Sequence, residues 1–222
     1  MELEMPAWKR RTDGEQRWPA AVAIAILIAL EWLLPDRLSL GPRWLFPGLQ
    51  VVIIGVIVAA NPGRMRKSSP MLRTLSLLLI AVASLANVYS VVRLVLDIVG
   101  GHDTGSAGDL LMAGGGIYLI NVLTFAVWFW ELDRGGPAER AAGSDPYPDF
   151  LFPPMTSPDM SKKNWEPYFL DYFYVAFTNA TAFSPTDTLP LSRWAKFAMV
   201  LESAIALVTA ALVIAKAVNA LA

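Results

Sequence analysis

Cysteine is absent from this chain, histidine occurs once, and charged residues are scarce. The absence of cysteine excludes disulfide bonds, thiolate metal sites and cysteine nucleophiles. The one histidine, His102, lies in the loop-like segment GGHDTGSAG without neighbouring metal ligands, so we expect neither a metal site nor a cofactor. Charged residues make up 17% of the chain, against about 25% in soluble domains. A water-facing surface is therefore hard to build from this sequence.

The shortage of charge is concentrated in several long windows, and 55% of all residues are hydrophobic. In hydrocarbon every backbone N–H and C=O group needs a partner within the protein, which leaves helices or a closed barrel. These windows are too continuous for barrel strands, in which apolar and polar residues alternate over about 10 residues. The sequence therefore predicts an all-α integral membrane protein that passes several times through the cell membrane, with the lipid bilayer as its partner.

Four apolar windows in the first part of the chain predict four transmembrane helices. A helix that crosses about 30 Å of hydrocarbon needs about 17 to 25 residues, and the first two windows are at or below that limit. We divide the chain into a four-span region at residues 1–132, a polar, proline-rich linker at 133–165 and a C-terminal region at 166–222. The four predicted spans are Pro19–Leu34, Leu45–Ala60, Leu72–Val99 and Asp109–Trp130.

A few polar residues and glycines interrupt these windows, and most of them have a structural interpretation. Arg93 and Asp97 are four residues apart, so they share one helix face and can pair. Isolated amides such as Asn87 and Asn121 favour hydrogen bonds between helices. The run Gly114–Gly116 favours close packing of another helix backbone. The acidic residues of the loops and the linker are expected to be solvated.

The segment from Asp171 to Ala220 has a distinct order of elements. A short aromatic helix, DYFYVAF, leads through TNAT into the extended stretch AFSPTD, and the turn TLPLSRW then begins a long, alanine-rich apolar helix. This order resembles the pore-forming half of tetrameric potassium channels, in which an aromatic pore helix precedes T-x-x-T-V-G-Y-G-D, a proline-containing turn and an inner helix. The matching positions are Asp171, Tyr174, Phe177, Thr178, Thr181, Asp187 and Pro190.

The resemblance implies four transmembrane helices followed by a short pore-type helix, a filter-like loop and a long inner helix, assembled as a homotetramer. It also implies ion transport of monovalent cations, because filter carbonyl groups replace the water around an ion. Glu202 and Thr209 become inner-helix positions facing a cavity, although the residues alone leave Glu202 equally free to bond a neighbouring helix. The filter-like residues are Thr178, Thr181, Ala182, Phe183, Ser184, Pro185, Thr186 and Asp187.

The filter-like segment departs from the family pattern at the positions that decide selectivity. Residues 182–187 stand where the family has V-G-Y-G-D, so both glycines are missing, and Pro185 fixes φ near about −65°. A stack of carbonyl rings for dehydrated potassium is therefore hard to build. We expect either a poorly selective cation channel, with a wider filter lined by the hydroxyl groups of Thr181, Ser184 and Thr186, or a closed pore.

Loop charge leads to a second architecture. Basic residues cluster before the first span and after the second, which predicts that the N-terminus, this loop and the linker are cytoplasmic. A potassium-channel pore loop, however, enters from outside. From the cytoplasmic side Pro167–Ser184 would have to cross, which gives six plain transmembrane helices in a transporter or in a non-conducting, partner-binding protein. The basic residues are Lys9, Arg10, Arg11, Arg17, Arg64, Arg66, Lys67 and Arg73.

Enzymes and nucleic-acid-binding proteins find little support in the sequence. The chain has no H-E-x-x-H or G-x-S-x-G motif and no evident nucleophile–base pair. Its net charge of −1 gives no indication of nucleic acid as a partner. We therefore predict a non-enzymatic membrane protein that resembles potassium channels, and we keep the six-span protein as the alternative.

Overall fold

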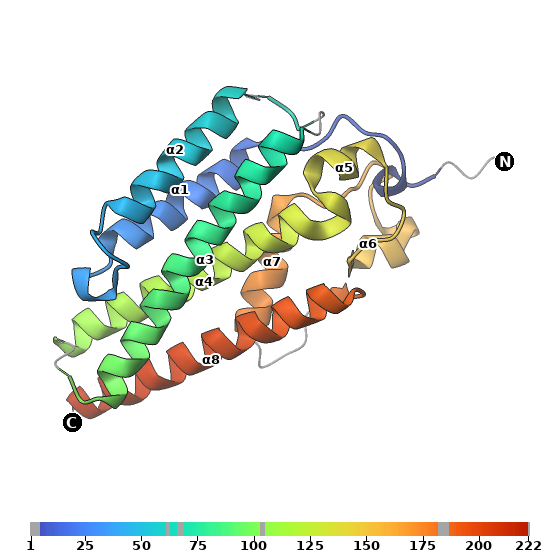
Figure 1. Ribbon diagram of the computed structural model, residues 1–222. Helices are drawn as coiled ribbons and strands as arrows, with labels where there is room; N and C mark the ends of the chain where they lie inside the picture. The colour runs from blue at the N-terminus through green and yellow to red at the C-terminus, as the bar shows by residue number, and fades with distance from the viewer. Residues whose placement is uncertain (1–4, 61–62, 66–68, 103–104, 182–186, 222) are drawn as a thin grey trace.

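The computed structural model describes residues 5–60, 63–65, 69–102, 105–181 and 187–221 and consists mainly of helices (Figure 1). The prediction of an all-α protein is confirmed. The principal helices are α1 (Trp18–Leu33), α2 (Leu45–Ala60), α3 (Pro70–Val99), α4 (Ala107–Leu132), α7 (Phe169–Ala180) and α8 (Arg193–Leu221).

Three of the described helices, α3, α4 and α8, are long and apolar enough to cross a membrane. Helices α1 and α2 are apolar as well but contain 16 residues each. Such a helix is about 24 Å long, which is shorter than a hydrocarbon core of about 30 Å. The four predicted spans match α1 to α4 to within two residues at either end. The apolar helices indicate a membrane-embedded protein.

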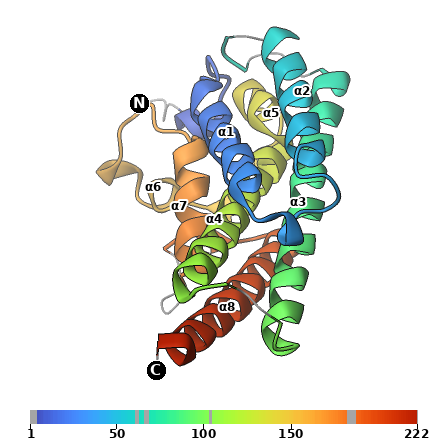
Figure 2. The same cartoon turned by 90° about the vertical axis from the view of Figure 1, so that its left-hand side faces the viewer.

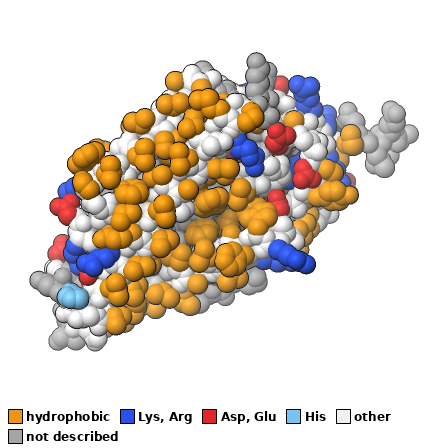
Figure 3. Space-filling model, viewed as in Figure 1, with side chains coloured by type: hydrophobic (Ala, Val, Ile, Leu, Met, Phe, Trp, Pro, Cys, Tyr) orange, Lys and Arg blue, Asp and Glu red, His pale blue; other side chains and the backbone are white. Residues whose placement is uncertain are grey.

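The surface of the molecule supports the same conclusion. Hydrophobic side chains cover much of the face over α2, α3 and α8, and charged side chains gather toward the two ends of the molecule (Figure 3). Large apolar residues on this surface include Val52, Leu85 and Phe197, which are 63%, 61% and 70% exposed. An apolar surface this extensive is unusual for a monomeric soluble protein and suits contact with lipid.

Helix α4 lies at the centre of the bundle, where it contacts α1, α3, α7 and α8 (Figures 1 and 2). Gly114 of α4 lets α8 approach closely, because a Cβ atom there would lie 2.5 Å from Cγ2 of Val213. The same construction at Gly115 finds nothing within 4 Å. The predicted helix packing at the glycine run is therefore confirmed at Gly114.

The connections gather at two ends of the bundle. At one of them, named here the linker end, the N-terminal segment meets the α2–α3 connection and the linker. The N–H of Met65 donates to the carbonyl of Glu15 (3.1 Å), and the N–H of Thr12 donates to the carbonyl of Ala141 (2.9 Å). Three segments that are far apart in the sequence are thus joined at the linker end.

The opposite end, named here the far end, holds the α1–α2 connection and the α3–α4 turn. There Asp97 pairs with Arg37 at 3.1 Å and with Arg93 at 3.6 Å. The predicted pairing of Arg93 with Asp97 is confirmed, and Arg37 adds a second, closer cation. Because α1 and α3 each run from the linker end to the far end, and α2 and α4 return, the chain reaches the linker at the end where it began (Figure 1).

The chain enters α7 at the linker end of the bundle and returns to the same end after this helix. At its start the N–H of Phe169 donates to the carboxyl of Glu15 at 2.6 Å. After α7 the chain comes back, because β2 (Leu189–Pro190) pairs antiparallel with β1 (Phe150–Leu151) of the linker. Helix α8 then runs from the linker end to the far end (Figure 1). The described course of the chain therefore does not use α7 to change ends.

Aromatic contacts hold the linker against the linker end of the bundle. The side chain of Tyr172 in α7 contacts the linker through Phe150 and Phe152, whose ring centroids lie 6.2 Å and 5.3 Å from its own. The described chain also has short helices near this end: the α-helices α5 (Pro137–Ala142) and α6 (Pro153–Thr156) and the 3-10 helices Ala7–Lys9, Asp133–Gly135 and Pro158–Met160. A further 3-10 helix, Asp36–Leu38, lies in the α1–α2 connection at the far end.

Candidate functional site

Four buried polar side chains in the apolar interior form a hydrogen-bonded series that we name the mid-bundle chain. It consists of Asn87 in α3, Asn121 in α4, Asn179 in α7 and Glu202 in α8. Asn87 Nδ2 donates to Asn121 Oδ1 (3.2 Å), and Asn121 Nδ2 donates to the backbone carbonyl of Glu202 (3.2 Å). Asn179 Nδ2 donates to Glu202 Oε2 at 2.7 Å. The predicted bonding of Asn87 and Asn121 between helices is confirmed.

The local structure of α7 explains how Asn179 reaches this position. At the N-terminus of α7, the carboxyl of Asp171 accepts the N–H of Tyr168 at 2.8 Å, which caps the helix. One face of α7 is buried at Tyr172, Val175 and Asn179, positions that share a side of a helix. Packing of this face on α4 places the last turn of α7 against α8.

Helix α8 holds the last turn of α7 through two adjacent residues. Besides the contact of Glu202, the hydroxyl of Ser203 donates to the carbonyl of Asn179 at 3.0 Å. Asn179 Nδ2 also donates to the carbonyl of Met199 at 2.8 Å. Glu202 lies nine residues after Arg193, or about 14 Å along α8. The C-terminus of α7 therefore lies beside α8 about a third of the way along that helix, inside the bundle.

The mid-bundle chain leaves polar atoms without partners. Among the described residues no group bonds Glu202 Oε1, Asn87 Oδ1 or Thr209 Oγ1, although all three atoms are buried. An unpartnered buried polar group costs free energy, and an ionisable side chain at membrane depth is a functional candidate by default. Glu202 is fully buried, so this carboxyl is the strongest such candidate in the described chain.

The structure places the predicted inner-helix residues on one side of α8. Glu202 and Thr209 are 0% and 2% exposed and lie two helical turns apart, on the side that packs into the bundle. Glu202 thus bonds a neighbouring helix, one of the two alternatives that the sequence left open. Among the described residues of a single copy, both side chains are buried by protein.

The filter-like residues are described only at their two ends. The hydroxyl of Thr178 donates to the carbonyl of Tyr174 (2.7 Å), and that of Thr181 donates to the carbonyl of Phe177 (2.9 Å). Thr181 is exposed at the end of α7, and Asp187 is exposed where the chain returns. The other filter-like residues lie outside the described residues: Ala182, Phe183, Ser184, Pro185 and Thr186.

A second polar group, named here the linker-end cluster, surrounds the start of α7. Asp133 accepts the hydroxyl of Tyr172 at 2.5 Å and the N–H of Asp149 at 2.8 Å. Arg140 donates to the carbonyls of Trp130 and Asp133 and lies over the ring of Tyr172. The cluster comprises Asp133, Arg134, Arg140, Asp149 and Tyr172.

Arg134 anchors the cluster to the N-terminal segment. Among the described non-glycine residues it alone has positive φ, at 51°, a conformation that costs of order 1–3 kcal/mol. Its backbone N–H donates to Asp149, and its guanidinium donates to the carbonyls of Asp145 and Trp8. These contacts hold the residue in place, with 2% of its surface exposed.

The expectation that the acidic residues of loops and linker are solvated is wrong for Asp133 and Glu15, which are 0% and 6% exposed. Glu15 accepts the indole N–H of Trp130 at 2.7 Å in addition to the N–H of Phe169. Burial raises the pKa of the Glu15 carboxyl above its ordinary value, and these hydrogen bonds oppose the shift. No local pattern marks these residues, because their partners lie far away in the sequence.

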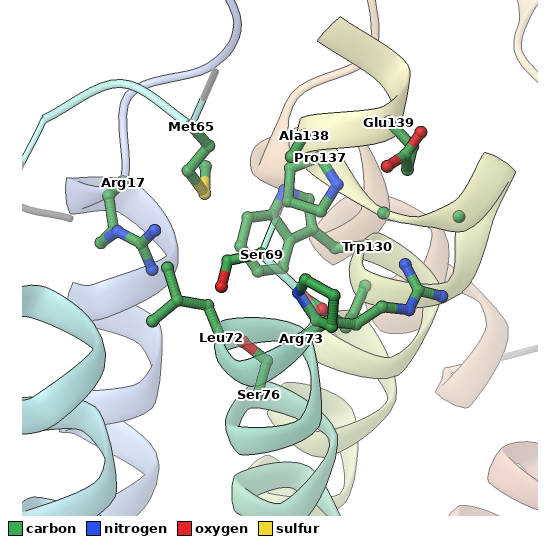
Figure 4. Close-up of a pocket in the computed structure, with 14 residues that line it drawn as sticks. Arg17, Met65, Ser69, Leu72, Arg73, Ser76, Trp130, Pro137, Ala138 and Glu139 are labelled. Carbon is green, nitrogen blue, oxygen red and sulfur yellow. The ribbon is translucent and has the colours of Figure 1, made fainter. Parts of the chain in front are cut away.

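A cavity of about 230 Å³ with charged side chains in its wall opens at the linker end between α3, α4 and α5. Arg17 and Arg73 lie on opposite sides of it, with Trp130 between them (Figure 4). Glu131 and Glu139 also line it, so charges of both signs are present. Within the described part of the chain no three His, Cys, Asp or Glu residues are grouped so as to hold a metal ion.

Two features thus distinguish the candidate site: a short helix that ends inside the bundle and a buried carboxyl that contacts its last turn. Comparisons with protein-family models, with curated proteins and with solved structures found no match for this chain. The function must therefore be inferred from the geometry and from the order of elements in the C-terminal region.

Proposed function

We propose that the protein is a channel-like membrane protein of the pore-loop type, in which α7 is the pore helix and α8 the inner helix. The observation that carries the proposal is the course of the chain around α7. The helix starts at the linker end, ends near the middle of the bundle, and is followed by β2 back at the linker end. A segment that enters and leaves a membrane on one side is a re-entrant loop, and the six-span alternative lacks this feature.

The direction of α7 suits a cation. The C-terminal end of a helix carries a partial negative charge equivalent to about half an elementary charge. In α7 this end points into the apolar layer, close to the carboxyl of Glu202. The exposed Thr181 stands at the same end and leads into the filter-like segment. Hydroxyl oxygens at this end, in a segment that lacks the filter glycines, fit a poorly selective cation path.

The exposed faces of α7 and α8 support assembly into an oligomer. Tyr174 and Phe177 are 50% and 43% exposed and lie along one side of α7. On α8, Val200 and Leu207 are 67% and 64% exposed. We infer that copies of the chain, four by the resemblance, meet at these faces around the ion path. Glu202 then lies behind the path and holds α7 in place.

The proposal includes a direction of insertion. The described basic residues on either side of the α1–α2 pair, among them Arg17 and Arg64, lie at the linker end, which the charge rule assigns to the cytoplasm. The proposed pore loop would therefore enter from the cytoplasm, opposite to the potassium-channel arrangement. This orientation reconciles the loop charges with a re-entrant α7.

Labelling of single cysteines tests the re-entrant course. The chain has no cysteine, so Met160→Cys in the linker, Asp187→Cys after α7 and His102→Cys at the far end each give one site. All three residues are exposed. With a membrane-impermeant thiol reagent, we expect Met160→Cys and Asp187→Cys to react from one side and His102→Cys from the other. Labelling of Asp187→Cys from the side opposite to Met160→Cys would support six plain spans instead.

Ion flux in liposomes tests conduction. We expect the purified wild-type protein to pass potassium and sodium with little preference, and Thr181→Val to change the rate or the ratio of the two. Thr156→Val is the matched control, because the hydroxyl of Thr156 also donates to a backbone carbonyl but lies in the linker. A monomeric protein without flux would leave the non-conducting alternative.

A further inference from the structure

A long apolar groove lies between α1 and α7, with α4 as its floor (Figure 2 shows the three helices). Its volume is about 630 Å³, more than twice that of the cavity between α3, α4 and α5. Glu15, Gln16 and Arg64 stand at one end of the groove, and the lining beyond them is apolar. The apolar and aromatic lining includes Trp18, Val22, Ala23, Ile26, Leu30, Leu119, Leu123, Phe169, Leu170 and Phe173.

The dimensions of the groove fit one leaflet of a bilayer. Along α1 its lining runs from Trp18 to Leu30, which is about 18 Å of helix. Half of a hydrocarbon core of about 30 Å is about 15 Å. The polar end is also the membrane boundary, because it belongs to the linker end, where Trp18 is 64% exposed. Indole rings are enriched at this level of membrane proteins.

The polar end presents a fixed cation. Arg64 Nη1 donates to the carbonyl of Gly14 at 2.9 Å, which holds the guanidinium beside the groove. Arg64 is exposed, and this bond uses one of the five N–H groups of its guanidinium, so others can face an occupant of the groove. A guanidinium presents several donors in a plane and binds phosphate through paired hydrogen bonds. An occupant with a phosphate at one end and an apolar chain is complementary to this groove.

We propose that the groove binds one phospholipid, with an acyl chain between α1 and α7 and the phosphate at Arg64. The acyl chain would contact Phe169, Leu170 and Phe173, so the lipid would support the first half of α7. This proposal rests on the groove and its charged end, and it is independent of whether the protein conducts ions.

Lipid retention tests the proposal. Native mass spectrometry of protein purified in mild detergent, with and without added phosphatidylglycerol or phosphatidylethanolamine, counts the bound lipids. We expect one retained phospholipid on the wild-type chain. Val22→Trp places a large ring in the groove and should remove the bound lipid. Val52→Trp, at an exposed position on α2 outside the groove, should leave the lipid bound. Val22 and Val52 are 49% and 63% exposed, so both variants should fold.

Arg64→Gln tests the phosphate contact separately. Loss of a charge-assisted hydrogen bond should weaken retention by about tenfold or more, and a diacylglycerol, which lacks phosphate, should bind no better to the wild type than to Arg64→Gln. Equal retention by Val22→Trp and Val52→Trp would overturn the proposal. Loss of an oligomer in Val22→Trp without loss of lipid would also overturn it, because the groove would then be an interface between copies of the chain.

Discussion

The mid-bundle chain and the linker-end cluster are both buried and polar, and both tie α7 to the helices around it. They differ in which atoms remain unpartnered. At the linker end each carboxyl oxygen of Asp133 has a partner, and Arg134 donates to backbone carbonyls of the linker and the N-terminal segment. The unpartnered buried atoms described there are nitrogens, Nη2 of Arg134 and of Arg140. In the mid-bundle chain, the amides donate to one another, to the carboxyl of Glu202 and to backbone carbonyls of α8, while the oxygens Glu202 Oε1 and Asn87 Oδ1 have no described partner.

The difference follows from what the backbone offers at each depth. Irregular segments such as those at Trp8 and Asp145 have carbonyl groups to spare, and these accept the guanidinium of Arg134. Inside a membrane helix the backbone N–H groups are already bonded to carbonyls one turn away, so few donors remain. A helix carbonyl has a second lone pair and can still accept a side-chain amide, as those of Met199 and Glu202 do, but a buried side-chain oxygen finds no spare donor. The linker end therefore supplies anchorage, while the middle is the place where a carboxyl remains available.

The largest effect is expected at the linker end. Asp133→Ala removes the acceptor of Tyr172 and a buried negative charge beside Arg140, and loss of one partner of a buried charged network costs about 3–5 kcal/mol. The melting temperature in detergent should fall on the order of 10 °C. Asp159→Ala, at an exposed site, is the control. Equal melting temperatures for the two variants would show that the cluster does not anchor α7.

Next in size is the close contact of α4 with α8. Gly114→Ala introduces a Cβ that would overlap Val213, and such overpacking costs about 1–3 kcal/mol. Gly115→Ala is the matched control, because open space surrounds that position and alanine favours a helix by about 0.5–1 kcal/mol. The melting temperature should therefore fall in Gly114→Ala and rise in Gly115→Ala. A fall in both would mean that α4 itself, rather than its packing on α8, limits stability.

The mid-bundle chain should be less sensitive. Asn121→Leu keeps the approximate volume but removes the acceptor of Asn87 and one donor to Glu202, and hydrogen bonds within membranes contribute about 0.6 to 1.7 kcal/mol. We expect a loss of about 1 kcal/mol in thermal stability. Asn219→Leu, exposed near the end of α8, serves as the comparison. A loss as large as that of Asp133→Ala would remove the distinction between the two regions.

The smallest effect concerns pH and Glu15. Its folded-state pKa is raised above 4.5 by burial, so the folded protein binds this proton more tightly than the unfolded chain does. The contribution of this carboxyl to the free energy of unfolding is fully present below the ordinary pKa of 4.5, and it is lost as the pH rises through the raised pKa. Melting curves of the wild type should therefore decline with rising pH more than those of Glu15→Gln. Identical pH profiles would mean that its hydrogen bonds to Trp130 and Phe169 offset burial.

Much of the fold could be predicted from the sequence because membrane helices are recognised by length and apolar composition. The predicted spans fall within two residues of α1 to α4, and the pairs Arg93–Asp97 and Asn87–Asn121 form as expected. The order of elements predicted from Asp171 onward also located the two helices α7 and α8. By contrast, Glu15 and Asp133 were expected to be solvated, because nothing near them in the sequence indicates that α4 and α7 cover them.

The sequence by itself determined which segments are apolar helices, since this depends on runs of neighbouring residues. Only the tertiary structure decided where α7 leads and where its neighbours point. The return of the chain depends on pairing of Phe150–Leu151 with Leu189–Pro190, which are far apart in the sequence. The direction of Glu202 depends on the rotation of α8, and a helix that is apolar on all sides carries little sequence information about which side faces the bundle.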